Sequence, residues 1–271
     1  MRVALINSGL GLLGTAAALR GLRPGTDLVL SMDPDGMPWG PRQPGDIARR
    51  SLGCARAASA YRPDVLVFAC NTGSVYALDV LREEFEPGLP VVGTVPAIKP
   101  AAAAGLPVAI WATAATTGSA YQRGLIERFA AGVPVAEVAC HGLADAIHAG
   151  DQAGIDAAVA AAAAQTPPDT RAVVLGCTEY ELAADSIAAA LAGVGLPGVT
   201  LFGSAAAVAA QALRRVADQP GRDADAAGNG SGQVHVLLSG RPGRLPAAAL
   251  LYPEGRLLAG QVPADGEPLR R

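Results

Sequence analysis

The sequence predicts an α/β protein made of two related α/β domains with mostly parallel sheets. Short apolar strands alternate with helical stretches, which is typical of βαβ units. The alternation starts again near residue 107. The segments RPDVLVFACNTGS and PDTRAVVLGCTEY also share one order: an apolar strand, a small residue, a cysteine and a polar helix start. We therefore expect two halves that each present one thiol.

In the first half, four apolar segments predict strands, and the stretches between them have helical character. A strand buried on both faces of a parallel sheet is a continuous apolar run, and DVLVFA at 64–69 is the clearest example. The predicted strands are 2–7, 27–33, 64–69 and 90–94, and the predicted helices are 10–20, 46–61 and 71–84.

The second half repeats the pattern and ends in a segment of different composition. Its predicted strands are 107–112, 135–139 and 172–175, and its predicted helices are 117–131, 143–149, 156–165 and 180–192. Residues 219–232 (QPGRDADAAGNGSG) are polar and rich in glycine, which predicts a flexible loop. Residues 233–238 then predict one more strand.

Composition excludes several classes of protein. The net charge is −3 and no cluster of lysine and arginine is present, so a nucleic-acid partner is not expected. Apolar runs are too short or too interrupted for a membrane span, and Asn7 and Ser8 break the one nearest the start. We expect a cytoplasmic protein with reduced thiols. The four cysteines form no Cys-x-x-Cys pair, so no metal site is expected.

Two of the cysteines, Cys70 and Cys177, are expected at the end of a strand and the start of a helix. A helix N-terminus offers unsatisfied N–H groups and the positive end of the helix dipole, and both stabilise a thiolate. Ligands of open α/β sheets also bind beyond the carboxyl ends of the strands. A lone cysteine is more often a small buried hydrophobe, but two in matching contexts indicate chemistry.

A pair of thiols suits one reaction in particular. Inverting a carbon centre requires a proton to leave one face and another to arrive at the opposite face. Two groups of similar acidity, one charged and one neutral, exchange these roles according to the handedness of the substrate. The sequence shows no metal or pyridoxal motif that would supply the acidity instead, so Cys70 and Cys177 are the candidate acid/base pair.

Six ordered motifs resemble the glutamate racemase branch of the aspartate/glutamate racemase superfamily. They cover most of residues 1–210, and VHVLLSG at 234–240 is similar to the family's returning C-terminal strand. The motifs are INSG (6–9), PWG (38–40), ACNT (69–72), VVGTVPA (91–97), ATAATTGSAY (112–121) and LGCTEY (175–180).

The resemblance implies two pseudosymmetric α/β domains, residues 1–96 with 206–271 and residues 97–205, with the active site in the cleft between them. It implies that Cys70 and Cys177 are the catalytic thiols, that no cofactor is needed, and that the substrate is glutamate or a related amino acid. A homodimer is possible, and D-glutamate for cell-wall peptidoglycan is the implied product. The implied substrate-binding residues are Ser8, Asn71, Thr72, Thr117 and Thr178, with the backbone of Pro38, Trp39 and Gly40 at the side-chain end of the pocket.

This chain departs from the family pattern at four positions. Asn7 stands where the family has Asp, and an amide cannot accept a proton. Glu179 replaces the His of GCTHY, and His148 stands at the position of a Glu, which suggests that these two partners are exchanged and still face each other near Cys177. The simpler interpretation is a solvated His148 and a Glu179 favoured by the helix dipole. Trp39 replaces the Tyr of PYG, which indicates either ordinary packing or a reshaped pocket.

Other interpretations stay open at this point. A superfamily relative could isomerise or decarboxylate a dicarboxylic acid, or the altered residues could mark a racemase-like protein that binds without turnover. The spacing of Gly9, Gly11 and Gly14, followed by Asp33, weakly matches a dinucleotide loop. We expect Cys54 to serve packing, and Cys140 with its neighbouring His to form no dyad, because adjacent strand residues point to opposite faces.

Overall fold

The computed structural model describes residues 1–219 and 231–260, which form two compact units. The first comprises Met1–Thr94 together with the described part of Ala205–Arg271, and the second is Val95–Ser204. The boundaries predicted from the sequence were 96/97 and 205/206. The predicted loop at 219–232 lies almost entirely outside the described residues.

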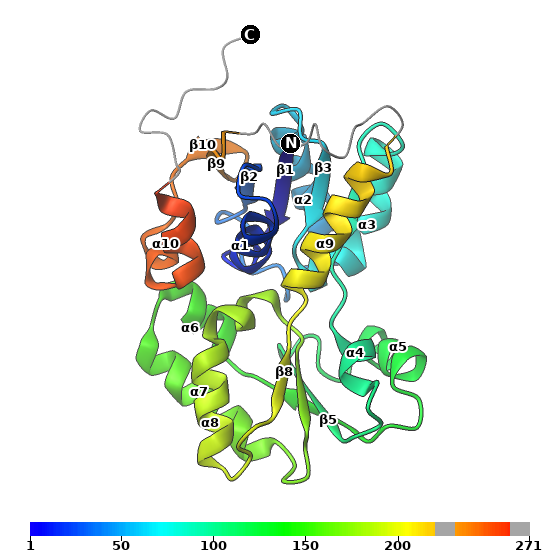
Figure 1. The fold of residues 1–271 in the computed structure, drawn as a ribbon, viewed down its shortest axis with the longest axis vertical. Coiled ribbons are helices and arrows are strands. Elements are labelled where there is room, and N and C mark those ends of the chain that lie inside the picture. The colour runs from blue at the N-terminus through cyan, green and yellow to red at the C-terminus, as the bar shows by residue number, and fades with distance from the viewer. Residues whose placement is uncertain (220–230, 261–271) are drawn as a thin grey trace. The chain divides into compact units, whose positions relative to one another are not determined.

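The first unit has a six-stranded sheet in the order β10-β9-β2-β1-β3-β4. Figure 1 labels β10, β9, β2, β1 and β3 of this sheet. Every neighbouring pair is parallel except β10 and β9. The returning strand β9 pairs with β2 in the register Leu28 to Val234, so the chain's last described segment completes the sheet of the first unit. The strands are β1 (Arg2–Asn7), β2 (Asp27–Met32), β3 (Val65–Phe68), β4 (Val91–Gly93), β9 (Val234–Leu238) and β10 (Arg241–Gly243).

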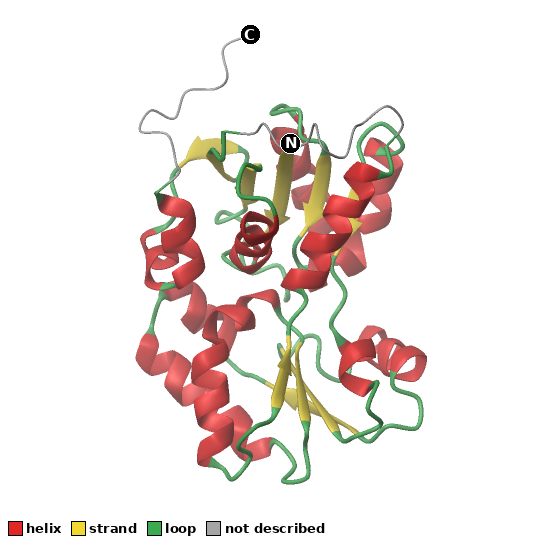
Figure 2. Ribbon diagram, in the orientation of Figure 1, coloured by secondary structure: helices red, strands yellow, loops and turns green. Residues whose placement is uncertain are grey.

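Helices cover both faces of this sheet (Figure 2). Helices α2 and α3 pack on one another and on one face, whereas α1 packs with α9 and α10. Because both faces are covered, the central strands β1, β2 and β3 are almost entirely buried, which explains their continuous apolar sequences, whereas the edge strand β10 is mostly exposed. The helices are α1 (Leu12–Leu22), α2 (Pro44–Ser59), α3 (Asn71–Phe85), α9 (Ala205–Ala217) and α10 (Pro253–Ala259), with a short 3-10 helix, η3, at Ala247–Leu251.

The second unit has a four-stranded parallel sheet in the order β6-β5-β7-β8. An apolar core lies between this sheet and α4 and α5, while α7 packs against both α6 and α8. The strands are β5 (Val108–Ala112), β6 (Val135–Ala139), β7 (Ala172–Leu175) and β8 (Thr200–Phe202). The helices are α4 (Ile98–Ala102), α5 (Ala120–Phe129), α6 (Leu143–Ala149), α7 (Gln152–Gln165), the 3-10 helix η1 (Thr178–Ala183) and α8 (Ala184–Gly193).

The predicted α/β class with mostly parallel sheets is confirmed. One predicted helix is built differently: residues 180–192 begin inside the 3-10 helix η1 and become α-helical only at Ala184, because the turn after Cys177 is tighter than an α-helix. The sequence interpretation also omitted β8, β10 and the helices α4, α9 and α10. Within the described residues, no helix has the length and apolar character that a membrane span requires.

Candidate active site

Both candidate thiols lie beyond the carboxyl end of a central strand. Cys70 follows β3 and directly precedes α3, of which it is the N-cap residue. Cys177 follows β7 and directly precedes η1. In each unit the neighbouring parallel strands end at the same edge of the sheet. Ser8, which follows β1, therefore lies at the same sheet edge as Cys70, and Thr117, which comes after β5, lies at the same sheet edge as Cys177. The predicted placement of both cysteines is therefore confirmed.

The sulfur of Cys70 is held by the first turn of its helix. The backbone N–H of Gly73 donates to Cys70 Sγ at 3.4 Å. A donor aimed at the sulfur at a helix N-terminus stabilises negative charge on it. Gly73 is required for this approach, since an added Cβ would lie 2.5 Å from the Phe68 ring.

Asn7 connects the ends of β1 and β3 next to Cys70. Its side chain is completely buried, and its Nδ2 donates to the carbonyl oxygen of Ala69. Its Oδ1 accepts from the backbone N–H of Gly9 at 3.1 Å and from the Ser8 hydroxyl at 3.3 Å. A carboxylate in this orientation would set an oxygen against the Ala69 carbonyl, so the amide suits this contact.

The three residues of the PWG motif differ sharply in exposure. Pro38 is exposed and Gly40 is half-buried, whereas the Trp39 side chain is only 1% exposed. The Trp39 ring packs 5.8 Å from the Phe68 ring, centroid to centroid, and its Nε1–H donates to Asp33 Oδ2 at 3.0 Å. The Trp39 side chain therefore belongs to the core, and a role of this motif in lining a pocket rests on its backbone.

In the second unit, Glu179 folds back onto the thiol of Cys177. The Cys177 thiol donates to Glu179 Oε2 at 3.0 Å, and the Thr178 hydroxyl contacts the same oxygen at 3.4 Å. The Glu179 residue is 9% exposed, whereas Cys177 is more accessible. A carboxylate in this position is able to accept the proton that the thiol must give up to act as a base.

His148, on α6, is half-buried and interacts electrostatically with Glu179. Burial lowers the pKa of the His148 imidazole below its ordinary value, and the negative charges of Glu179 and Asp145 oppose part of that shift. Its Nδ1 is buried without a hydrogen-bond partner within the described part of the chain. Burial therefore favours the neutral form of the His148 imidazole.

We expect the pH dependence of stability to report the burial of His148. A histidine whose pKa is lower in the folded state binds fewer protons there than in the unfolded chain. Its contribution to stability is therefore present above its unfolded pKa, for which the ordinary value is 6.5, and is lost as the pH falls below it. Urea unfolding of His148→Gln between about pH 7 and pH 5 should show a shallower loss of stability than the parent protein.

His235→Gln is the matched comparison for this experiment. The pKa of His235 is also lowered by burial, but this residue lies in β9 of the first unit, against Tyr61. The two substitutions should flatten the pH profile independently and additively. A His148→Gln profile as steep as that of the parent protein would contradict a buried neutral imidazole.

The remaining predicted residues have these positions. Asn71 is buried and Thr72 half-buried at the start of α3, and the half-buried Thr117 donates its hydroxyl to the carbonyl oxygen of Thr113 at 3.1 Å.

Sequence reasoning assigned no role to Tyr180, which is fully buried and donates its hydroxyl to the carbonyl oxygen of Cys140 at 3.4 Å. Burial raises the Tyr180 pKa well above its ordinary value, so Tyr180 supports η1 as a neutral phenol.

The other two cysteines are buried, in keeping with the packing role expected for Cys54. Cys54 and Cys140 are both buried, and burial raises the pKa of each thiol to about 12. Cys54 lies within the apolar core of the first unit. The thiol of Cys140 donates weakly to the carbonyl oxygen of Val138.

Sequence similarity to known proteins matches this arrangement. A family model described as Asp/Glu/Hydantoin racemase matches residues 12–212. The chain belongs to this family. This racemase is 35% identical over 222 residues to a glutamate racemase of Herpetosiphon aurantiacus, covering 79% of this chain and 84% of the relative. It is 34% identical over 234 residues to one of Pseudomonas putida, covering 82% and 86%.

Solved structures of racemases share the fold of this racemase. The Escherichia coli glutamate racemase, in complex with L-glutamate and the activator UDP-MurNAc-ala, aligns with a TM-score of 0.76 and 26% identity over 92% of this chain and 91% of that one. The Thermus thermophilus enzyme in complex with β-chloro-D-alanine aligns with a TM-score of 0.66 and 26% identity over 88% and 87%. The predicted family and the amino-acid racemase class are confirmed, and no similarity favours the oxidoreductase, decarboxylase or silent-binder alternatives.

Proposed function

We propose that this racemase interconverts L- and D-glutamate with Cys70 and Cys177 as its two acid/base groups. The observation that carries the proposal is the matched placement of the two thiols. Each follows a central parallel strand and each begins a helix, in a chain about 35% identical to glutamate racemases. Ligands of parallel α/β sheets bind at this edge.

In the proposed reaction, one cysteine enters as a thiolate and the other as a thiol. The thiolate removes the α-proton from one face of the amino acid, which leaves a carbanion. The thiol gives its proton to the opposite face, so the product has inverted configuration and the two sulfurs have exchanged protonation states. For the other enantiomer the two cysteines exchange the roles of base and acid, and no net proton is consumed.

The two cysteines have different partners, which suggests that each thiolate is prepared in its own way. The Cys177 proton has a nearby acceptor in Glu179, 3.0 Å away, and His148 takes part through its interaction with that carboxylate. Cys70 instead receives the N–H of Gly73, and Asn7 holds the adjacent peptide by donating to Ala69. In this proposal Glu179 acts as proton acceptor, and His148 and Asn7 are positioning residues.

The proposed contacts to the substrate are polar groups at the two sheet edges. Hydroxyl and amide side chains and exposed backbone N–H groups suit carboxylates and an ammonium group. A homodimer and a cytoplasmic supply of D-glutamate for peptidoglycan form part of the same proposal. The contact residues are Ser8, Asn71, Thr72, Thr117 and Thr178, together with the backbone of Pro38, Trp39 and Gly40.

The test is α-proton exchange with glutamate in deuterated water. We expect the protein to exchange the α-proton of both L- and D-glutamate, read by NMR, and to racemise each, read by circular dichroism. Cys54→Ala is the matched control, since it removes a buried thiol of the core and should leave the rates near those of the parent protein. Exchange with another amino acid and not with glutamate would overturn the substrate assignment. The absence of exchange with any amino acid would overturn the proposed reaction.

A further inference from the structure

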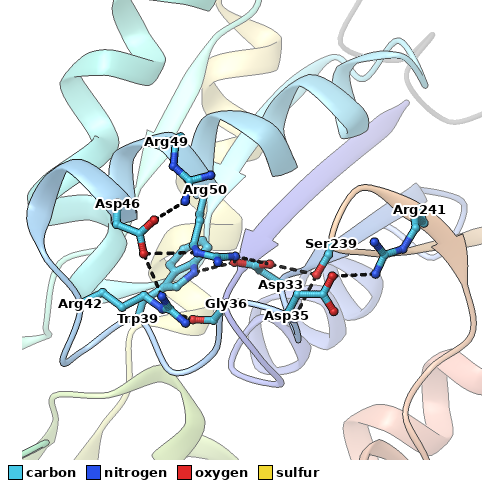
Figure 3. A network of polar contacts seen from close by, with 10 residues as sticks. All are labelled: Asp33, Asp35, Gly36, Trp39, Arg42, Asp46, Arg49, Arg50, Ser239 and Arg241. Atoms are coloured by element: carbon cyan, nitrogen blue, oxygen red, sulfur yellow. Dashed lines mark hydrogen bonds and ion pairs between the residues drawn. The ribbon is translucent and has the colours of Figure 1, made fainter.

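A network of charged and polar side chains surrounds Asp33, immediately after β2 in the first unit (Figure 3). Asp33 is 3% exposed, which is unusual for a carboxylate, and its oxygens are well supplied with donors. Oδ2 accepts from Trp39 Nε1 at 3.0 Å and lies 3.2 Å from Arg50 Nη1. Oδ1 accepts from the Ser239 hydroxyl at 2.9 Å. Neither of the two proposed half-reactions uses this carboxylate.

The backbone of Asp33 holds the segment that leads to Pro38. The carbonyl oxygen of Asp33 accepts from the N–H groups of Gly36 and Met37 at 3.0 and 2.9 Å, and its own N–H donates to the carbonyl oxygen of Ser8 at 3.2 Å. Gly36 has no room for a side chain here, because an added Cβ would lie 2.0 Å from Asp33 Oδ2 and 2.4 Å from Arg50 Nη1. One residue therefore connects the end of β1 to residues 36–40.

The remaining members of the network hold Arg50 in place. Asp46 pairs with Arg50 at 3.4 Å and with Arg42 at 2.8 Å, and Arg49 also contacts it. Arg42 in turn donates to the carbonyl oxygen of Gly36. Because Arg50 keeps Asp46 as a second partner, replacement of Asp33 does not leave its guanidinium without an anion.

We infer that Asp33 is a positioning residue that fixes the Pro38–Gly40 backbone through the indole N–H of Trp39, and so selects for substrate side-chain length. The inference rests on the proposed function, in which that backbone lines the side-chain end of the pocket. The indole of Trp39 is able to donate a hydrogen bond but not to accept one, and the buried carboxylate of Asp33 is a strong acceptor for it. The Trp39 ring is held in position by packing against Phe68, which is two residues before Cys70. Its hydrogen bond to Asp33 fixes the rotation of the ring.

The test compares Trp39→Phe and Asp33→Asn with the parent protein. Trp39→Phe keeps an aromatic ring against Phe68 and removes the N–H donor. We expect each variant to raise KM for L-glutamate about tenfold with little change in kcat, because a less firmly held Pro38–Gly40 backbone must be ordered when the substrate binds. The ratio of kcat/KM for L-glutamate to that for L-aspartate should fall, and the double variant should lose little more than either single one.

Arg241→Ala is the matched control, because it removes the exposed ion pair with Asp35 in the same region and leaves Asp33 untouched. It should leave KM and the glutamate-to-aspartate ratio unchanged. A lower Tm in Trp39→Phe and Asp33→Asn with an unchanged ratio would overturn the inference, since a purely structural role affects both substrates equally. An additive double variant would also overturn the coupling between the two side chains.

Hydrogen exchange separates failure of this inference from failure of the proposed function. In Asp33→Asn, the indole N–H of Trp39 and the amides of residues 36–40 should exchange faster, whatever the protein catalyses. Unchanged exchange there would overturn the inference and leave the proposed function intact. If exchange is faster in Asp33→Asn but the parent protein racemises neither amino acid, the proposed function is overturned, and with it the role of Asp33 in selecting the substrate.

Discussion

Replacing Cys177 by alanine is expected to lower racemisation of glutamate by about a thousandfold or more, and replacing Cys70 is expected to do the same. The reason is that each substitution removes the only proposed proton carrier on one face of the substrate, and positioned acid/base groups contribute roughly 10² to 10⁴ in rate. The two variants should differ in one respect. Each variant keeps a base for one enantiomer of glutamate. Slow α-proton exchange without inversion should therefore be seen with one enantiomer in Cys177→Ala and with the other enantiomer in Cys70→Ala.

The measurement is NMR exchange with each pure enantiomer in deuterated water, alongside circular dichroism for inversion. Cys140→Ala serves as a comparison in the second unit, where this thiol is buried and its pKa is raised to about 12. Racemisation at the parent rate by either Cys70→Ala or Cys177→Ala would contradict the two-thiol mechanism. Exchange of the same enantiomer by both variants would contradict the assignment of one thiol to each face.

Glu179→Gln is expected to lower kcat by roughly a hundredfold or more while KM changes little. Glutamine keeps the shape of the side chain but cannot take up the proton that Cys177 donates to Glu179 Oε2 across 3.0 Å. The loss should appear in kcat because the carboxylate contacts the thiol.

Glu181→Gln is a close control on the same 3-10 helix. Glu181 accepts from the N–H and the hydroxyl of Ser204 at 2.8 and 3.0 Å, contacts that a glutamine oxygen is able to keep. This variant should retain the parent kcat in a steady-state racemisation assay. A Glu179→Gln enzyme with the kcat of Glu181→Gln would show that the carboxylate next to Cys177 takes no part in proton transfer.

Much of the fold follows from local sequence. Strands such as Val65–Phe68 and Ala172–Leu175 are runs of apolar residues buried on both faces, and this makes them visible without coordinates. The position of each cysteine next to its strand is equally local. The three-residue strands β8 and β10 are too short to give a period. Helix α9, by contrast, has a regular apolar face made of Ala205, Val208, Ala209, Ala212 and Val216, so its helical period was present in the sequence and was overlooked.

The contacts around the site were less predictable. Glu179 is two residues from Cys177, yet whether its carboxylate turns toward the sulfur depends on the tight η1 turn. Asp33 was noticed only for its spacing after three glycines, because its partners Trp39, Arg50 and Ser239 come from separate segments. The periodicity of the sequence gives no information on contacts between side chains from separate segments. The buried ring of Trp39 was likewise one of two interpretations, and coordinates were needed to choose between them.

The parallel pairing of β9 with β2 has a consequence for how the protein is made. Gln233 donates to Asp27 across a sequence separation of 206 residues, whereas the second unit is one uninterrupted segment, Val95–Ser204. During synthesis from the N-terminus, the second unit has all of its strands as soon as residue 204 leaves the ribosome. The sheet of the first unit is completed only after β9 has been translated near the end of the chain. Nascent chains therefore pass through a stage in which β2 is an open sheet edge, the kind of surface that chaperones protect.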